Sequence, residues 1–179
     1  MGVFEHFRKT RDYLVCVDSD GCILSNMDLK HKECFCPATV NVWGLQNISN
    51  YAREAAEFVN LYSASRGMNR FPALIQTIDL TFERPEVLDS GVEKPDMGAL
   101  REWVMNTDKL SAPSLVIELA TNPDDTLIRA VRWSGEVDKN IAHIVHGIRP
   151  FRHVIEALRV LGEFADIVVV SATPQEALT

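Results

Sequence analysis

Two aspartates spaced two residues apart are the side chains in this sequence best placed to do chemistry. Asp18 and Asp20 follow a short apolar segment and precede Gly21. Residues two apart in an extended chain point the same way, so both carboxylates can face one cavity. Two carboxylates held together repel, which favours a bound divalent cation or one shared proton. Magnesium commonly takes one or two carboxylates plus phosphate oxygens, so the pair predicts a magnesium site.

The alternative is an ordinary turn, because Asp, Ser and Gly are common where a strand ends. Two apolar segments favour the site. Residues 13–17 lead directly into Asp18, and residues 167–170 lead into Ser171. Both segments are rich in β-branched residues without polar alternation, which predicts buried strands and makes Cys16 a buried thiol. Because ligands bind outside the carboxyl ends of parallel strands, these polar residues are expected at one edge of a sheet.

A helix is expected directly before the second strand, over residues 150–161. It begins with a proline, which suits the first helical position, and Val154, Leu158 and Leu161 repeat on one face. Gly162 then supplies a stop. A helix followed by a buried strand is typical of a parallel α/β sheet. We therefore expect an α/β fold with a Rossmann-like parallel-sheet core that is incomplete at the C-terminus.

The long segment between the two strands has a different, mainly helical character. Helices are predicted over residues 50–64 and 96–107, with a third that opens at 123–125. The apolar face of the first is expected to consist of Tyr51, Ala55, Phe58, Val59 and Tyr62. Trp43, Trp103 and Trp133 are expected to build a core here rather than to stack on a ligand.

These patterns predict two domains. Residues 1–26 and 148–179 form the α/β core, and residues 27–147 form a helical domain inserted into it. A length of 179 residues allows one domain, or a small core with an insertion.

Composition narrows the partners and the compartment. The net charge of -7 is the wrong sign for binding a nucleic acid, although a local positive site can still bind a small phosphorylated substrate. No apolar run approaches the roughly 18 residues that span a bilayer, and no signal peptide is recognisable, so we expect a cytoplasmic protein with no membrane partner. His31, Cys34 and Cys36 lack the paired C-x-x-C spacing of a structural zinc site.

On these residues the chain resembles the haloacid dehalogenase superfamily of phosphohydrolases. Residues 13–24 look like its first motif, an apolar strand followed by D-x-D-G, and residues 167–171 look like its second, an apolar strand ending in Ser or Thr. The insertion between them resembles the helical cap that many members carry. The matched regions, residues 12–26 and 147–174, cover roughly a quarter of the chain.

The resemblance implies a role for each matched residue. Asp18 is the expected nucleophile, which forms an aspartyl-phosphate. Asp20 is expected to protonate the leaving oxygen and then to deprotonate the attacking water. Asp18 and Asp20 would bind Mg2+, the latter through its main-chain carbonyl, and Ser171, Ser19 and Gly21 would bind the phosphate. Because the dehalogenases of the superfamily lack an acid at the place of Asp20, carbon–halogen cleavage is not expected.

Three departures from the family pattern stand out. Cys22 replaces the usual Thr, and Ser25-Asn26 stands where an acidic residue is common. The family's later Lys and acidic metal-binding loop have no match before Thr179. We therefore expect a truncated and impaired chain, or a site completed by a C-terminal segment or by a homo-oligomer. The alternatives to a phosphomonoester hydrolase are a phosphomutase and a catalytically silent binding fragment.

The insertion also offers candidate substrate contacts in Arg66, Asn69 and Arg70. Guanidinium groups suit phosphate or carboxylate recognition, and a helix end can present them toward a core domain. The alternative is a solvated helix terminus, where cations interact favourably with the helix dipole.

Overall fold

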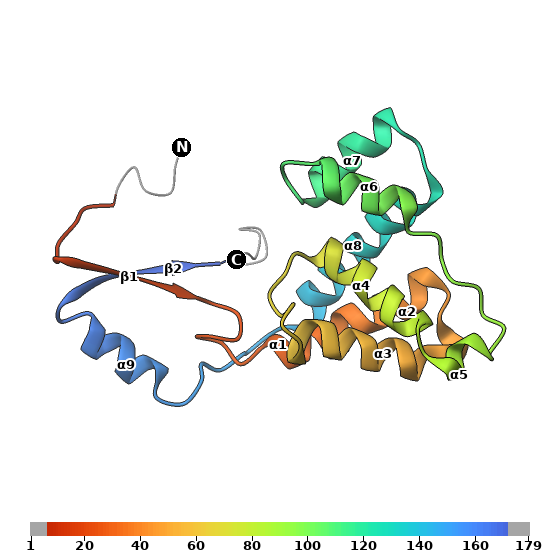
Figure 1. The fold of residues 1–179 in the computed structure, drawn as a ribbon. Helices are drawn as coiled ribbons and strands as arrows, with labels where there is room; N and C mark the ends of the chain where they lie inside the picture. Colours follow the sequence, from red (N-terminus) through yellow and green to blue (C-terminus); the bar gives the residue numbers. More distant parts are fainter. Residues whose placement is uncertain (1–6, 172–179) are drawn as a thin grey trace. The chain divides into compact units, whose positions relative to one another are not determined.

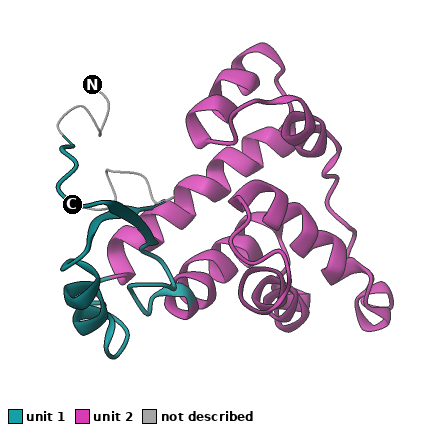
Figure 2. Ribbon diagram, turned by 60° about the vertical axis from the view of Figure 1, so that its left-hand side comes forward, with its two compact units in different colours: residues 1–27, 146–179 teal, residues 28–145 magenta. Residues whose placement is uncertain are grey.

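The computed structural model describes residues 7–171 and is a mixed α/β structure, mostly helical, with one small parallel sheet (Figure 1). The chain divides into two compact units (Figure 2). Residues 1–27 and 146–179 form the first, here called the sheet unit, and residues 28–145 form the second, the helical unit. Whether the helical unit acts as a cap on the sheet unit stays a prediction.

The sheet is formed by β1 (Tyr13–Asp18) and β2 (Ala165–Val170), which pair in parallel. Tyr13 lies opposite Ala165, and Asp18 lies opposite Val170. This confirms both predicted strands and the coarse α/β class. Within residues 7–171 the sheet has these two strands only, so a larger Rossmann-like core stays a prediction.

The predicted burial of the strands is wrong. Tyr13 is 70% exposed, Val169 and Val170 are also exposed, and Cys16 is an exposed free thiol rather than a buried one. The reason is the small number of covering elements, because α9 (Val154–Leu161) is the helix that packs on the sheet through β2. A strand that is apolar on both faces is buried only where both faces are covered.

The predicted helix before β2 is confirmed as α9, which ends at Gly162 as expected. Val154, Leu158 and Leu161 are the partly buried positions of this helix. Their spacing puts them on one stripe, and this stripe faces β2.

The helix begins four residues later than predicted because the chain before it is extended. Pro150 pairs antiparallel with Leu24, and the Phe151 amide donates to the Ile23 carbonyl at 2.9 Å. These bonds hold the backbone away from helical geometry until His153, which has a left-handed φ of 67°. They also join the two separate chain segments of the sheet unit.

A second tie joins these segments at the start of β2. Asp166 accepts hydrogen bonds from the Thr10 amide at 2.9 Å, the Thr10 hydroxyl at 2.5 Å and the Arg11 amide at 3.1 Å. The hydrogen bonds from Thr10 lower the pKa of the Asp166 carboxyl, because they stabilise its charged form. The segment before β1 is therefore fixed to β2 as well as to its own strand.

The helical unit is a succession of short helices around one core. Its elements are α1 (Met27–Leu29), the π-helical turn η1 (Lys30–Phe35), α2 (Cys36–Trp43), the 3-10 turn η2 (Gln46–Ile48), α3 (Ser49–Glu57), the π-helical turn η3 (Phe58–Tyr62), α4 (Arg70–Phe82), α5 (Pro85–Leu88), α6 (Gly98–Asn106), α7 (Ala112–Thr121) and α8 (Asp125–Ile144).

The three predicted helices of the insertion are present as α3 with η3, as α6, and as α8. The last begins as its sequence suggests, because the Asp124 carboxylate caps it by accepting from the Thr126 and Leu127 amides at 2.7 and 3.2 Å. The helices α2, α4 and α7 were not predicted from the sequence.

The buried face of α3 and η3 differs from the prediction. Phe58 and Tyr62 are 51% and 65% exposed, and the buried stripe consists of Ala52, Ala55, Ala56 and Val59. This stripe has the i, i+3, i+4, i+7 spacing of one helix face. Alanine allows the close approach of α2 and α4, which pack against α3, so small residues are buried and the large rings are left outside.

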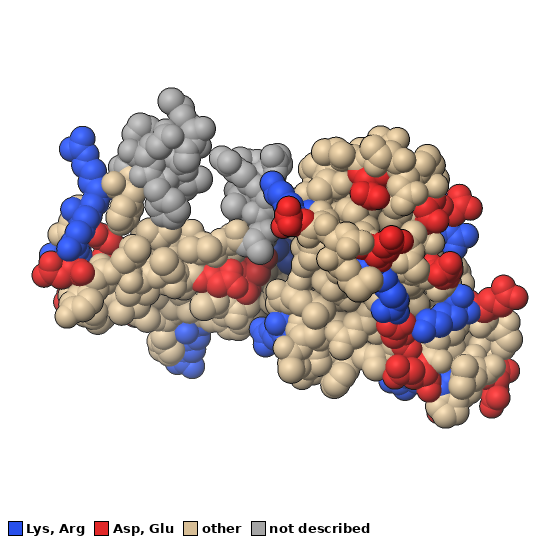
Figure 3. Space-filling model, turned by 45° about the horizontal axis from the view of Figure 1, so that its top comes forward, with Lys and Arg blue, Asp and Glu red and all other residues tan. Residues whose placement is uncertain are grey.

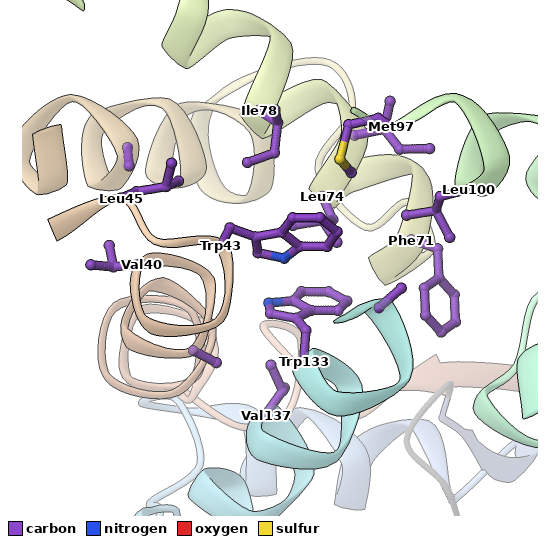
Figure 4. Packing of buried hydrophobic residues seen from close by; sticks show 14 of the residues in the cluster. Val40, Trp43, Leu45, Phe71, Leu74, Ile78, Met97, Leu100, Trp133 and Val137 are labelled. Carbon is purple, nitrogen blue, oxygen red and sulfur yellow. The ribbon is translucent and has the colours of Figure 1, made fainter. Parts of the chain in front are cut away.

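The core of the helical unit is built around the three tryptophans, as predicted, and Figure 4 shows Trp43 and Trp133 pointing into its middle. All three are buried. The Trp133 Nε1 donates to the Thr39 hydroxyl at 3.0 Å, and the Phe71 and Trp103 rings meet edge to face with centroids 5.0 Å apart. Such aromatic pairs stabilise a core beyond the area they bury.

Acidic and basic side chains are interspersed over the described part of the face that Figure 3 draws. The net charge of -7 is therefore not concentrated in one acidic region of that face. Within residues 7–171, none of the helices combines the length and the apolar character needed to cross a membrane.

An ion-pair network joins α4 to α6. Asp79 on α4 accepts from Arg101 Nη2 at 2.5 Å and lies 2.8 Å from Lys94 Nζ. Partial burial raises the pKa of the Asp79 carboxyl, but the hydrogen bonds from Arg101 and Lys94 outweigh it and the net pKa is lowered. A lowered pKa means that the charged carboxylate stabilises the folded state at neutral pH.

We predict that Asp79→Asn lowers the free energy of unfolding by about 1 kcal/mol at pH 7, a value kept small because the network is partly exposed. The difference from the wild type should narrow as the pH falls below the ordinary carboxyl pKa of about 4, because the wild type then loses the charge as well. Urea unfolding at pH 7 and pH 3 measures both effects. Asp89→Asn, at a side chain with no partner in residues 7–171, is the matched control. Equal stability of the two variants would contradict the prediction.

Candidate active site at the carboxyl edge of the sheet

The parallel pairing of β1 and β2 brings polar residues from distant parts of the chain to one edge. Asp18 lies opposite Val170, the last residue of β2. One position further, the Ser19 hydroxyl donates to the Ser171 hydroxyl at 2.7 Å, although the two residues are 152 apart in sequence. This confirms the expectation that the two strands end at a common polar edge.

The Asp18 side chain is exposed at this edge. Within residues 7–171 it makes no hydrogen bond and no ion pair. A carboxylate that merely ended a strand as part of a turn would be expected to bond to nearby backbone amides. The Asp18 oxygens are instead accessible to a ligand, as a nucleophile or a metal ligand must be.

Asp20 has a different environment. It is partly buried, and its Oδ1 accepts a hydrogen bond from Asn26 Nδ2 at 2.5 Å. Asn26 is 2% exposed, and its own Oδ1 accepts from the Gly21 amide at 3.3 Å. The sequence pattern singled out Asn26 only as a departure from the family motif. The available signal was a carboxamide placed just after a glycine turn, where it can fold back onto the residues before the turn.

The turn between these residues is tight. The Ile23 and Leu24 amides both donate to the Ser19 carbonyl, at 3.1 and 2.9 Å, and the Gly21 amide donates to the Leu24 carbonyl at 2.9 Å. Gly21 has a φ of 71°, a left-handed conformation that glycine adopts without strain. Gly21 therefore serves as the turn residue of this segment, and its predicted phosphate-binding role stays a prediction.

The predicted phosphate ligands are not equally available. The Gly21 amide proton is already shared between the Leu24 carbonyl and Asn26 Oδ1, and the Ser19 hydroxyl proton is used by Ser171. In the bond from Ser19, the Ser171 oxygen is the acceptor, and this bond occupies one of its two lone pairs. The Gly21 amide and the Ser19 hydroxyl are therefore engaged as donors, whereas Ser171 is the acceptor of its bond with Ser19.

The donor chemistry of this edge fits magnesium. Asp18 supplies a carboxylate oxygen and Asp20 a main-chain carbonyl oxygen, and Mg2+ prefers such hard oxygen ligands while keeping several waters. In the part of the chain that the structure describes, no group of three or more His, Cys, Asp and Glu side chains is arranged around a metal position. Water and substrate oxygens would have to complete the coordination of a metal here.

Arg70, a predicted substrate residue, has partners within the helical unit. Its Nη1 donates to the Asp138 carboxylate at 2.7 Å and to the Ser134 hydroxyl at 3.1 Å. Its guanidinium carbon lies 5.5 Å from the centre of the Phe35 ring. These contacts tie the start of α4 to α8 and to η1, which gives Arg70 a structural role.

Asn69 and Arg66 differ in whether their side chains have bonding partners in the described structure. Asn69 caps α4 by accepting from the Phe71 amide at 3.0 Å, and its Nδ2 donates to the Leu110 carbonyl at 2.9 Å, so its polar groups are used within the helical unit. The Arg66 side chain is exposed and has no bonding partner within residues 7–171. Of the three predicted substrate residues, Arg66 is therefore the one whose side chain is not bonded to another residue in the described structure.

We predict opposite effects for the same substitution at two glycines. Gly21→Ala should destabilise the sheet unit by about 1 kcal/mol, because alanine is strained at a left-handed φ. Gly135→Ala, on the exposed face of α8 where an added Cβ meets no atom within 4 Å, should stabilise the helical unit by up to about 1 kcal/mol. Hydrogen exchange resolved by residue measures each unit separately. A Gly21→Ala protein with unchanged exchange over residues 19–26 would refute the role given to this turn.

No family model, no curated protein and no solved structure matches the chain.

Proposed function

We propose that the chain is a cytoplasmic, magnesium-dependent phosphomonoester hydrolase of the haloacid dehalogenase type, which acts on a small phosphorylated metabolite. One observation carries the proposal. Two carboxylates at the carboxyl end of a parallel strand have different environments. The Asp18 side chain is exposed and makes no hydrogen bond or ion pair within residues 7–171, whereas the Asp20 side chain is partly buried and bonded to Asn26. A nucleophile and an acid need this kind of difference.

In the first half-reaction, an Asp18 carboxylate oxygen attacks the phosphorus of the substrate. The bond from phosphorus to the ester oxygen breaks, and the leaving oxygen takes a proton from the Asp20 carboxyl. The products of this step are the free alcohol, an aspartyl-phosphate on Asp18 and an ionised Asp20. The covalent intermediate divides one difficult displacement into two easier ones.

In the second half-reaction, water attacks the phosphorus of the aspartyl-phosphate. Asp20, ionised by the first step, accepts a proton from this water as the bond between phosphorus and the Asp18 oxygen breaks. Inorganic phosphate leaves, and both carboxyl groups return to their starting protonation states. One residue thus serves as acid and then as base, which requires it to be held in one place through both steps.

The remaining groups at the edge stabilise charge. A magnesium ion bound by Asp18 and Asp20 would neutralise charge on the transferring phosphoryl group. The Ser171 hydroxyl is a candidate donor to a phosphoryl oxygen, and its bond from Ser19 fixes the position of Ser171 Oγ. A phosphomutase would share the first half-reaction and differ only in the acceptor, which would be a sugar hydroxyl instead of water.

We predict that Asp18→Asn lowers the magnesium-dependent hydrolysis of p-nitrophenyl phosphate at least about a thousand-fold, because the amide cannot act as the nucleophile. The phosphoprotein seen by mass spectrometry after acid quenching should be lost as well. Removing the metal with EDTA should suppress the hydrolysis by the wild-type chain in the same assay.

Asp12→Asn is the matched control, because Asp12 precedes the opposite end of β1 and, among residues 7–171, its side chain pairs only with Lys9, at 3.7 Å on an exposed surface. Its activity should equal that of the wild type. Hydrolysis or phosphorylation that persists in Asp18→Asn would remove Asp18 as the nucleophile. A wild-type chain that binds phosphate esters without any turnover would favour the silent binding role instead.

A further inference from the structure

We propose that Asn26 is a positioning residue that fixes the catalytic carboxyl of Asp20 and decides which of its oxygens carries the proton. This inference rests on the proposed function, since it assigns Asn26 a part in the protonation of the leaving group. It goes beyond that function because the motif match gave Asn26 no role.

Burial and hydrogen bonding together fix the Asn26 side chain. Among the described residues of the sheet unit, Asn26 is the most buried polar one, at 2% exposure, and both ends of its carboxamide are bonded. Its Nδ2 donates to Asp20 Oδ1 at 2.5 Å, and its Oδ1 accepts from the Gly21 amide at 3.3 Å. A buried carboxamide with both ends bonded has one favourable orientation, because turning it over would bring like groups together.

The backbone that carries Asn26 is also held by hydrogen bonds. The residue directly before it, Ser25, donates its amide to the Arg149 carbonyl at 3.4 Å, and the Phe151 amide donates to the Ile23 carbonyl at 2.9 Å. This short antiparallel pairing fixes the chain leading into Asn26 from a segment more than a hundred residues away. The carboxamide therefore projects from a held backbone onto Asp20.

The bond from Asn26 also bears on where the Asp20 proton lies. The Asn26 Nδ2 can only donate, so Asp20 Oδ1 must be an acceptor in this bond. When Asp20 is protonated, its proton is consequently placed on Oδ2. When Asp20 is ionised after the first half-reaction, the same bond stabilises the carboxylate until water is deprotonated. Asn26 can thus serve both protonation states without moving.

The test compares two phosphate esters with different needs for an acid. The leaving group of 2,4-dinitrophenyl phosphate departs as a stable anion, whereas glycerol 2-phosphate would release an alkoxide and depends on protonation. We expect Asn26→Ala to lower kcat/KM for glycerol 2-phosphate about 10- to 100-fold more than for 2,4-dinitrophenyl phosphate, because it removes part of the roughly 100- to 10,000-fold that general acid catalysis contributes. A residue with only a structural role would lower both values equally.

Asn26→Asp separates the two bonds of the side chain. It keeps an oxygen for the Gly21 amide but puts a carboxylate where Asp20 needs a donor, so the selective loss should persist even if the turn is intact. Circular dichroism and thermal unfolding establish that each variant is folded. Asn60→Ala is the control, because it deletes a carboxamide that bonds the Ala56 carbonyl at 2.8 Å in the helical unit.

The outcomes distinguish a failure of the Asn26 positioning role from a failure of the proposed function. A selective loss with glycerol 2-phosphate in both Asn26 variants, and none in Asn60→Ala, supports the positioning role. An equal loss with both esters overturns it and leaves the proposed function standing, provided that Asp18→Asn is inactive. If Asp18→Asn hydrolyses both esters as the wild type does, the proposed function fails, and the role of Asn26 fails with it.

Discussion

The parallel hydrogen-bonded pairing of β1 with β2 is the constraint on which the candidate site depends. It joins Asp18 and Ser171, which belong to segments separated by the whole helical unit. A loop this long makes the pairing entropically unfavourable, although the penalty grows only slowly with loop length. The ties that hold the segments together are therefore important, namely the bonds of Asp166 to Thr10 and of Phe151 to Ile23.

The two carboxylates of the motif differ in what surrounds them. Asp18 ends a strand and its side chain is exposed. Asp20 lies inside the following turn, is partly buried and accepts a hydrogen bond from Asn26. The turn itself depends on the left-handed conformation of Gly21. One tight turn thus gives two identical side chains different freedom, and the proposed division of labour between nucleophile and acid follows from that difference.

The helical unit holds itself together independently of the sheet. Its core contains all three tryptophans, and its polar ties, such as Asp79 with Arg101 and Arg70 with Asp138, lie between its own helices. The described residues of the sheet unit, 7–27 and 146–171, form no comparable core, because the strands and α9 leave large apolar side chains exposed. Stability and candidate chemistry are thus divided between the two units.

Local sequence determined the features that depend on neighbouring residues. The two strands, the end of α9 at Gly162, the cap of α8 at Asp124 and the turn at Gly21 could all be predicted, because strand patterning, capping and left-handed φ values are local properties. The order of Asp18, Asp20 and Ser171 along the chain also suggested a common edge.

Tertiary structure decided everything that depends on which surfaces meet. Packing against α2 and α4 buries Ala52 and Ala56 and leaves Phe58 exposed. The periodicity of the sequence had instead predicted that Phe58 lies on the buried face. Distant pairing delayed the start of α9, and the Ser134 and Asp138 side chains gave Arg70 a structural role. The bond between Asn26 and Asp20 belongs here too, because only the folded turn shows where a carboxamide six residues away points.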